Sequence, residues 1–92
     1  MNATITKLDC WGQSIWRVFA MHLGETVKGL YCVDFDNQDD AENACVDTAR
    51  RNDWGLHLQI FYTPGKPAGS VRTIPAPSTL GRIDPTAAAT VQ

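Results

Sequence analysis

One segment in the middle of the chain carries a full set of signals for an α-helix, and this limits how the rest can fold. Asp36 and Asn37 are good N-cap residues, because their side-chain oxygens can accept hydrogen bonds from free backbone amides. Arg50 and Arg51 stand where the helix dipole favours positive charge. An apolar stripe at helical spacing is formed by Ala41, Cys45, Thr48 and Ala49. The pattern predicts one helix that ends near residues 52–53.

The segments on either side of this helix have the composition of β-strands. Four of them are rich in β-branched and aromatic side chains: residues 3–9, 14–22, 30–35 and 56–63. For residues 14–22 a helix is the alternative, because Ile15 and Phe19 are four residues apart. The aromatic and β-branched content favours a strand there. Residues 23–29 hold two glycines and predict a hairpin turn.

Alternation within two of these strands predicts which side chains share a face. Tyr31, Val33 and Phe35 should lie together on one face of the third strand. In the strand over residues 56–63, one face is formed by Leu56, Leu58, Ile60 and Tyr62. This leucine-rich face is expected to pack against the apolar stripe of the helix.

All five prolines lie beyond Tyr62, where the composition changes sharply. Residues 71–74 predict a short edge strand, and residues 75–92 predict an irregular tail, extended where proline fixes the backbone. The order strand, strand, strand, helix, strand predicts an α+β fold, with an antiparallel sheet of about four strands and one helix packed on a face. The expected division is a single domain of residues 1–74 followed by the proline-rich tail.

Charge is unevenly distributed along the chain, although the net charge is only −2. Residues 34–49 contain six carboxylates and no cation, whereas residues 50–92 contain five cations and two carboxylates. The helix dipole and solvation explain part of the acidic zone. Its functional interpretation is an anionic surface that meets a cationic groove, and the cations are suited to phosphate or to an acidic protein surface. The candidate partner contacts are Asp39, Asp40, Asp47, Arg50, Arg51, Lys66, Arg72 and Arg82. Asp47 is also spaced to pair with Arg51 one helical turn later.

Common motifs for metals and phosphates are incomplete here. A calcium-binding EF-hand loop that starts at Asp34 needs glycine at its sixth position and glutamate at its twelfth, where the chain has Asp39 and Cys45. No pair of cysteine or histidine residues has zinc-ligand spacing. The Gly65-Lys66 pair lacks the other residues of a phosphate-binding loop. We therefore expect no metal, no cofactor and no catalytic residues.

The chain contains three cysteines, Cys10, Cys32 and Cys45, and two histidines. An odd cysteine count without a recognisable signal peptide predicts reduced thiols in a cytosol, where they act as small packing residues. No apolar stretch reaches the roughly 18 residues that a membrane span needs. A small enzyme that uses one of the cysteines together with a histidine is an alternative that the sequence leaves open.

Residues 1–16, MNATITKLDCWGQSIW, and residues 33–44, VDFDNQDDAENA, resemble a phage-encoded anti-CRISPR protein of the type I-F class. The resemblance covers essentially the full length of the chain. It implies a non-enzymatic inhibitor in the cytoplasm of an infected bacterium, which binds the guide-RNA-loaded surveillance complex. Such proteins obstruct hybridisation of target DNA or recruitment of the nuclease. The class has no common motif, so the resemblance implies no set of functional residues.

Three functional hypotheses follow from the sequence. The first is a monomeric inhibitor that contacts protein subunits of a type I-F surveillance complex, with guide RNA as a further contact, and blocks hybridisation of target DNA. The second is a small regulatory module that binds nucleic acid directly through Arg72, Arg82 and the tail. The third is the thiol enzyme.

Overall fold

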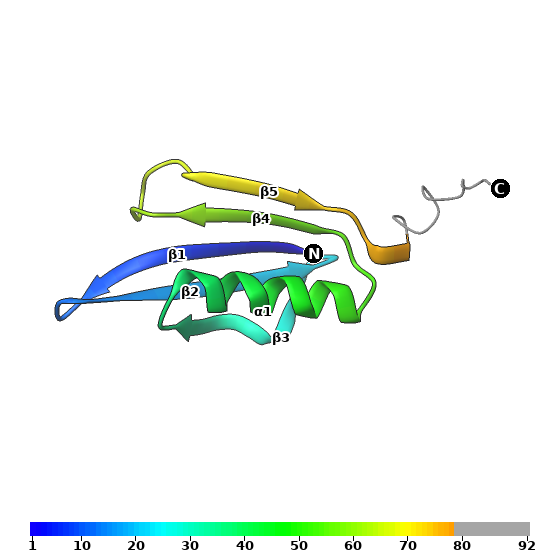
Figure 1. Ribbon diagram of the computed structural model, residues 1–92, viewed down its shortest axis with the longest axis horizontal. Coiled ribbons are helices and arrows are strands. Elements are labelled where there is room, and N and C mark those ends of the chain that lie inside the picture. The colour runs from blue at the N-terminus through cyan, green and yellow to red at the C-terminus, as the bar shows by residue number, and fades with distance from the viewer. Residues whose placement is uncertain (79–92) are drawn as a thin grey trace.

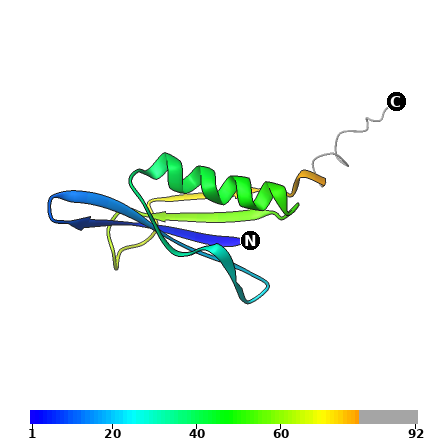
Figure 2. The ribbon, with the colours of Figure 1, turned by 90° about the horizontal axis from the view of Figure 1, so that it is seen from below.

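The computed structural model describes residues 1–78, which form one five-stranded sheet and one helix. In chain order the elements are β1 (Asn2–Cys10), β2 (Gln13–His22), β3 (Glu25–Phe35), α1 (Gln38–Arg51), β4 (Leu56–Phe61) and β5 (Ser70–Ile74). The strands lie in the spatial order β3-β2-β1-β4-β5, and α1 lies across one face of the sheet (Figures 1 and 2). The predicted α+β class is confirmed, as is the edge strand over residues 71–74.

The sheet is mixed, so the predicted antiparallel arrangement is wrong. Strands β1 and β2, β2 and β3, and β4 and β5 pair antiparallel, but β1 and β4 pair parallel. Parallel strands need a long connection, usually one that contains a helix. Here α1 carries the chain back over the sheet before β4 begins, so β4 enters beside β1 in the same direction.

Two tight hairpins join the first three strands. Cys10 pairs with Gln13 and His22 with Glu25, so each loop has two residues, Trp11-Gly12 and Leu23-Gly24. The strand predicted over residues 14–22 is confirmed, and the helix alternative is wrong. The turn predicted over residues 23–29 is much shorter than expected, because β3 already begins at Glu25.

Both loops place a bulky residue in a strained backbone conformation. Trp11 has φ of 54° and Leu23 has φ of 52°, and the glycine after each also has positive φ. Positive φ at both positions is what a type I′ hairpin turn requires. For a residue other than glycine, this left-handed conformation costs about 1–2 kcal/mol.

An irregular stretch of β3 corrects one prediction about side-chain faces. Val33 pairs with Val18, whereas Tyr31 pairs with the next residue, Phe19, because Cys32 is an extra residue with φ of 59°. Such a bulge shifts the alternation by one position. Tyr31 therefore lies on the face opposite to Val33, and it is 44% exposed. Its ring packs edge to face against the ring of Phe19, with 5.1 Å between the ring centroids.

The core lies between α1 and the central strands. The largest fully buried side chains are Ile5, Leu58, Ile60, Val18 and Cys45. The predicted helix stripe is confirmed for Ala41, Cys45 and Ala49, which are buried, whereas its fourth member, Thr48, is only half-buried. The leucine-rich face is confirmed for Leu56, Leu58 and Ile60, whereas Tyr62 follows the end of β4 and is exposed. Small side chains on α1 thus allow the helix to lie close above a sheet that supplies the larger ones.

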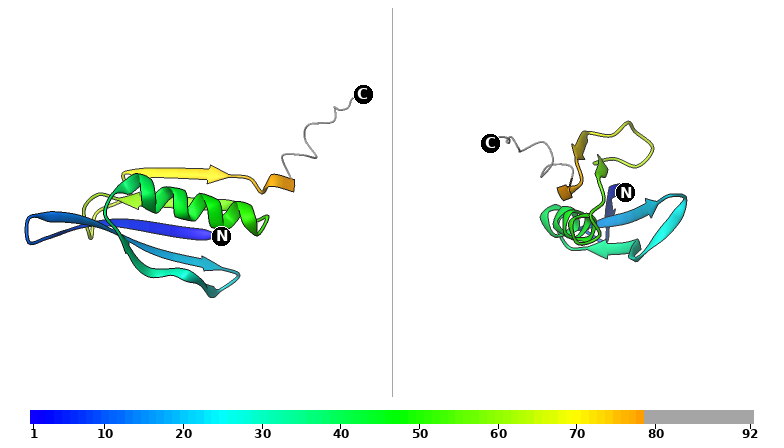
Figure 3. Two further views of the ribbon diagram at one scale, coloured as in Figure 1. Left: turned by 60° about the horizontal axis from the view of Figure 1, so that its bottom comes forward. Right: turned by 90° about the vertical axis from the view of Figure 1, so that its right-hand side faces the viewer.

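The end-on view of Figure 3 shows α1 on one side of the sheet, with the other side uncovered by any described element. Within residues 1–78, no helix has the length and apolar character needed to cross a membrane. Most of the predicted tail, including Arg82, lies outside the described residues. The proposed boundary between domain and tail at residue 74 stays a prediction.

Candidate interaction surface

The outer side of α1 gathers five of the eight predicted contact residues. We define the α1 charged face as the exposed side chains of Asp39, Asp40, Asn43, Asp47, Arg50 and Arg51. These residues point outward because the opposite side of the helix, with its stripe of small residues, is buried against the sheet. From first to last they cover roughly 18 Å of helix at 1.5 Å per residue. The face is acidic where the helix begins and basic where it ends.

The start of α1 is fixed by the predicted N-cap. Asn37 caps the helix, since its Oδ1 accepts a 2.8 Å hydrogen bond from the backbone N–H of Asp40. In return Asn37 Nδ2 donates to the Asp40 carboxylate at 3.1 Å. The carboxylates of Asp39 and Asp47, by contrast, have no hydrogen bond or ion pair with any other described residue. On the α1 charged face, these two carboxylates are therefore free to bind a partner.

The predicted ion pair between Asp47 and Arg51 is wrong. Arg51 instead donates through Nε to the backbone oxygen of Asp47 and through Nη2 to Thr48 Oγ1, both at 3.4 Å. The guanidinium folds back onto the last turn, where carbonyl groups lack partners within the helix and the dipole is negative. Asp47 therefore keeps its carboxylate exposed beside two arginines.

A groove runs between the second half of α1 and the bent part of β3. One open hollow of about 560 Å³ is lined by Lys28, Leu30, Asp47, Arg50 and Arg51, among others. A second hollow of about 560 Å³ shares Lys28 and Arg51 with the first and continues to the stacked rings of His22 and Trp54, whose centroids are 3.8 Å apart. We call these two hollows the α1–β3 groove. It brings three cations, Lys28, Arg50 and Arg51, to one place.

Sequence reasoning missed Lys28, because nothing in its neighbourhood indicates that it meets the helix. Val27 and Leu30 are both buried, since β3 bends so that four residues of β3 stand opposite Ala20 alone. Lys28 stands in this bend and lines the same hollow as the second half of α1. The glycine at position 29, which has φ of 85°, was the available signal for an irregular strand.

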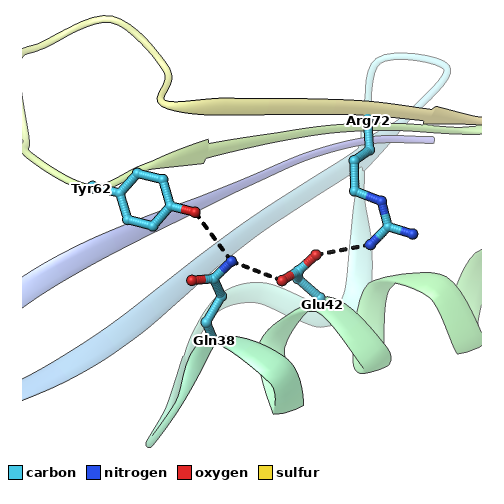
Figure 4. A network of polar contacts seen from close by, with 4 residues as sticks. All are labelled: Gln38, Glu42, Tyr62 and Arg72. Atoms are coloured by element: carbon cyan, nitrogen blue, oxygen red, sulfur yellow. Dashed lines mark hydrogen bonds and ion pairs between the residues drawn. The ribbon is translucent and has the colours of Figure 1, made fainter.

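Arg72 belongs to a different surface, where it links β5 to α1. Its Nη1 donates to Glu42 Oε1 at 2.9 Å, and the Glu42 side chain is only 15% exposed. Gln38 Nε2 donates to the other Glu42 oxygen at 2.9 Å and to the Tyr62 hydroxyl at 3.3 Å (Figure 4). We call these four residues the Glu42 network. Arg72 is therefore engaged within the fold, and its role as a partner contact stays a prediction.

The remaining predicted cations are not brought to the α1 charged face. Lys66 lies exposed in the turn between β4 and β5, where its backbone N–H donates to the Thr63 oxygen. Arg82 lies outside the described residues. The structure thus groups Asp39, Asp40, Asp47, Arg50 and Arg51, and it separates Lys66 and Arg72 from them.

Asp34, the first carboxylate of the acidic stretch, is paired on the uncovered face of the sheet. Arg17 donates to it through two nitrogens, at 2.7 and 3.0 Å. These hydrogen bonds lower the pKa of Asp34 below its usual value and raise the pKa of Arg17. Asp34 therefore contributes to sheet pairing and stands apart from the α1 charged face.

The three cysteines have different surroundings. Cys45 is buried under α1, and burial raises the pKa of its thiol to about 11. It is therefore protonated at neutral pH and a poor nucleophile. Cys10 and Cys32 are exposed, so the prediction that all three are packing residues is wrong for these two, which lie on a hairpin and at a bulge. Among residues 1–78, no group of three or more histidine, cysteine or acidic side chains is placed to hold a metal ion.

Comparison with known proteins found no match: no family model, no curated protein and no solved structure corresponds to this chain. The assignment of a function therefore depends on the geometry of the described residues and on the sequence resemblance.

Proposed function

We propose that the protein is a phage-encoded, non-enzymatic inhibitor that binds a type I-F CRISPR surveillance complex in the cytoplasm of the infected host and blocks hybridisation of target DNA. The observation that carries the proposal is the α1 charged face. Two of its three carboxylates, those of Asp39 and Asp47, are exposed and have no partner among residues 1–78. The resemblance of the sequence to inhibitors of this class supports the same conclusion.

The α1 charged face is suited to competing with nucleic acid for a cationic surface. A surface that holds a guide or target strand presents lysine and arginine to phosphate groups. Carboxylates on a helix form the same charge-assisted hydrogen bonds with those cations. Because α1 is held by buried Ala41, Cys45 and Ala49, its charges are already positioned, and binding requires little further ordering of the chain.

The basic end of the face supports a second contact with the same complex. Lys28, Arg50 and Arg51 surround the α1–β3 groove, next to the carboxylate of Asp47. An acidic protein surface or the backbone of the guide RNA would complement these cations. Opposite charges at the two ends of one helix also favour a single orientation of the inhibitor on its target, because the reversed orientation brings like charges together.

A mobility-shift experiment tests this proposal. Purified type I-F complex is incubated with increasing amounts of the protein before labelled target duplex is added. We expect loss of the shifted duplex at a stoichiometric ratio. Unchanged DNA binding at excess protein, with the protein shown to be bound to the complex, would overturn the DNA-blocking mechanism and leave exclusion of the nuclease to be measured by cleavage of prebound target.

The cations of the α1–β3 groove also favour a second candidate function, direct binding of nucleic acid by a small regulatory module. Arg72 supports this function less than the sequence predicted, since its guanidinium already pairs with Glu42. The isolated protein would then shift labelled DNA or RNA at moderate salt and release it at high salt, because phosphate contacts release counterions. Absence of any shift at low salt would exclude this function.

A further inference from the structure

The two hairpin tips combine features that stability alone does not favour. Trp11 is 98% exposed and Leu23 is 88% exposed, and each holds positive φ at the first position of its turn. Asparagine, aspartate or glycine is the usual residue there, since each tolerates the left-handed conformation. A large apolar residue at this position is both strained and in full contact with water. Neither cost is offset within the described part of the chain.

The tip of the β1–β2 hairpin is also well placed to reach another molecule. It extends beyond the start of α1 at one end of the sheet (Figures 1 and 3). Its two strands pair continuously from Asn2 and Met21 to Cys10 and Gln13. Close to the turn, Ser14 Oγ donates to Asp9 Oδ1 at 2.8 Å across the pair. Strand pairing and this hydrogen bond therefore hold the projecting tip in place, with the indole of Trp11 at its end.

We propose that Trp11 is an anchor residue that inserts into an apolar pocket on a folded protein partner. This inference rests on the proposed function, and the partner is a protein subunit of the surveillance complex. Tryptophan is strongly enriched among the residues that dominate binding energy, because it buries a large rigid area at little entropic cost. A braced hairpin keeps that cost low, since the turn is already in its bound conformation.

The charges around Trp11 favour protein over nucleic acid or an anionic membrane. Among residues 9–14 the only charged side chain is that of Asp9, so the tip carries negative charge and no cation. Proteins that stack bases on aromatic rings combine those rings with a positively charged surface that holds the phosphates. Leu23 lies on the hairpin at the other end of β2, so it cannot enter the same pocket.

The test uses two matched substitutions in the full-length protein, W11N and L23N. Each replaces a strained apolar residue by asparagine before glycine, the preferred sequence of a type I′ turn. We expect both variants to unfold at the same temperature as the parent or a few degrees higher. We expect W11N to bind the immobilised surveillance complex at least about tenfold more weakly, through faster dissociation, and L23N to stay within about twofold.

Each contrary outcome is informative. If the parent protein binds the complex and W11N binds equally well, the anchor is overturned and the proposed function stands. If the parent does not bind, the proposed function is overturned and the anchor falls with it. A lower unfolding temperature for W11N would assign Trp11 a structural role and overturn the anchor. A role in RNA binding would also overturn the anchor. If the isolated parent protein shifts labelled single-stranded RNA and W11N does not, Trp11 is assigned to base stacking.

Discussion

The two sides of α1 differ in size, polarity and partners. The inner side presents Ala41, Cys45 and Ala49, all buried against the sheet. The outer side presents Asp39, Asp47 and Arg50, all exposed, and their charged groups have no hydrogen-bonding partner among residues 1–78. The two sides of this one short helix therefore have different roles. Its inner side fixes the position of the helix, and its outer side carries charges that form no ion pair within residues 1–78.

This difference teaches where a substitution should affect stability and where it should affect binding. Burial of apolar side chains supplies most of the favourable free energy of folding, whereas an exposed, unpaired charge contributes little. Changes beneath α1 should therefore lower the free energy of unfolding and leave the surface chemistry intact. Changes on the α1 charged face should leave the free energy of unfolding nearly unchanged and should weaken binding to a partner.

Leu58→Ala should have the largest effect, because it opens a cavity directly below α1. Leu58 is fully buried on β4. Removing a buried leucine side chain costs about 2–5 kcal/mol of unfolding free energy. Val71→Ala is the control, since Val71 is a β5 side chain that is 53% exposed on the uncovered face. We expect it to cost less than about 0.5 kcal/mol. Denaturant unfolding measures both, and equal losses would contradict the division between the two faces.

Cys45 should make stability fall at alkaline pH. Burial raises its pKa from 9.0 to about 11, so the folded protein retains the thiol proton to higher pH than the unfolded chain does. Its contribution is complete below pH 9 and is lost as the pH rises towards 11. The loss amounts to about 2 kcal/mol by linkage. Unfolding measured from pH 8 to 11 for the parent and for Cys45→Ala checks this, because the variant should lose less stability over that range.

The Glu42 network should contribute a smaller amount. Arg72→Ala leaves the half-buried Glu42 carboxylate with Gln38 as its remaining partner in the network. Because the Arg72 side chain is 49% exposed, solvent screening reduces the loss to about 1 kcal/mol. Lys66→Ala removes the same charge from an exposed turn and should change stability by less than about 0.5 kcal/mol. High salt should reduce the difference in unfolding free energy between the two variants. A difference that does not respond to salt would instead indicate lost packing of the arginine side chain.

The features that the sequence predicted well are local ones. Asn37, the stripe of Ala41, Cys45 and Ala49, and the end of the helix at Asn52 depend on residues within one or two turns. Hydrogen bonds and burial at such short range follow directly from residue type and spacing. The alternation of Leu56, Leu58 and Ile60 was equally direct. For these elements the sequence pattern and the packing agree.

The errors concern relations between distant residues or single irregular ones. The parallel pairing of β1 with β4 depends on how α1 crosses the sheet, which no strand pattern records. The bulge at Cys32 is not predicted by a glycine at that position, and this bulge moves Tyr31 to the opposite face. Glu42 and Arg72 are separated by 30 residues, so their ion pair becomes visible only when β5 is placed beside β4. The exposure of Trp11 follows from its place in a two-residue turn, which only the pairing of Cys10 with Gln13 reveals.

Charge reversal on the α1 charged face should have the smallest effect on stability and a clear effect on association. Asp47→Lys changes an exposed side chain in the second half of the helix, so we expect a change of less than about 0.5 kcal/mol in unfolding free energy. If Asp47 meets a cationic groove on the surveillance complex, association should slow by about tenfold at low salt and depend less steeply on salt. Asp36→Lys is the matched control, because it makes the same change in net charge at an exposed residue of the loop before α1, outside both the α1 charged face and the α1–β3 groove. Association rates measured at three salt concentrations separate the two variants. Equal rates for both would mean that net charge, and not the outer side of α1, governs recognition.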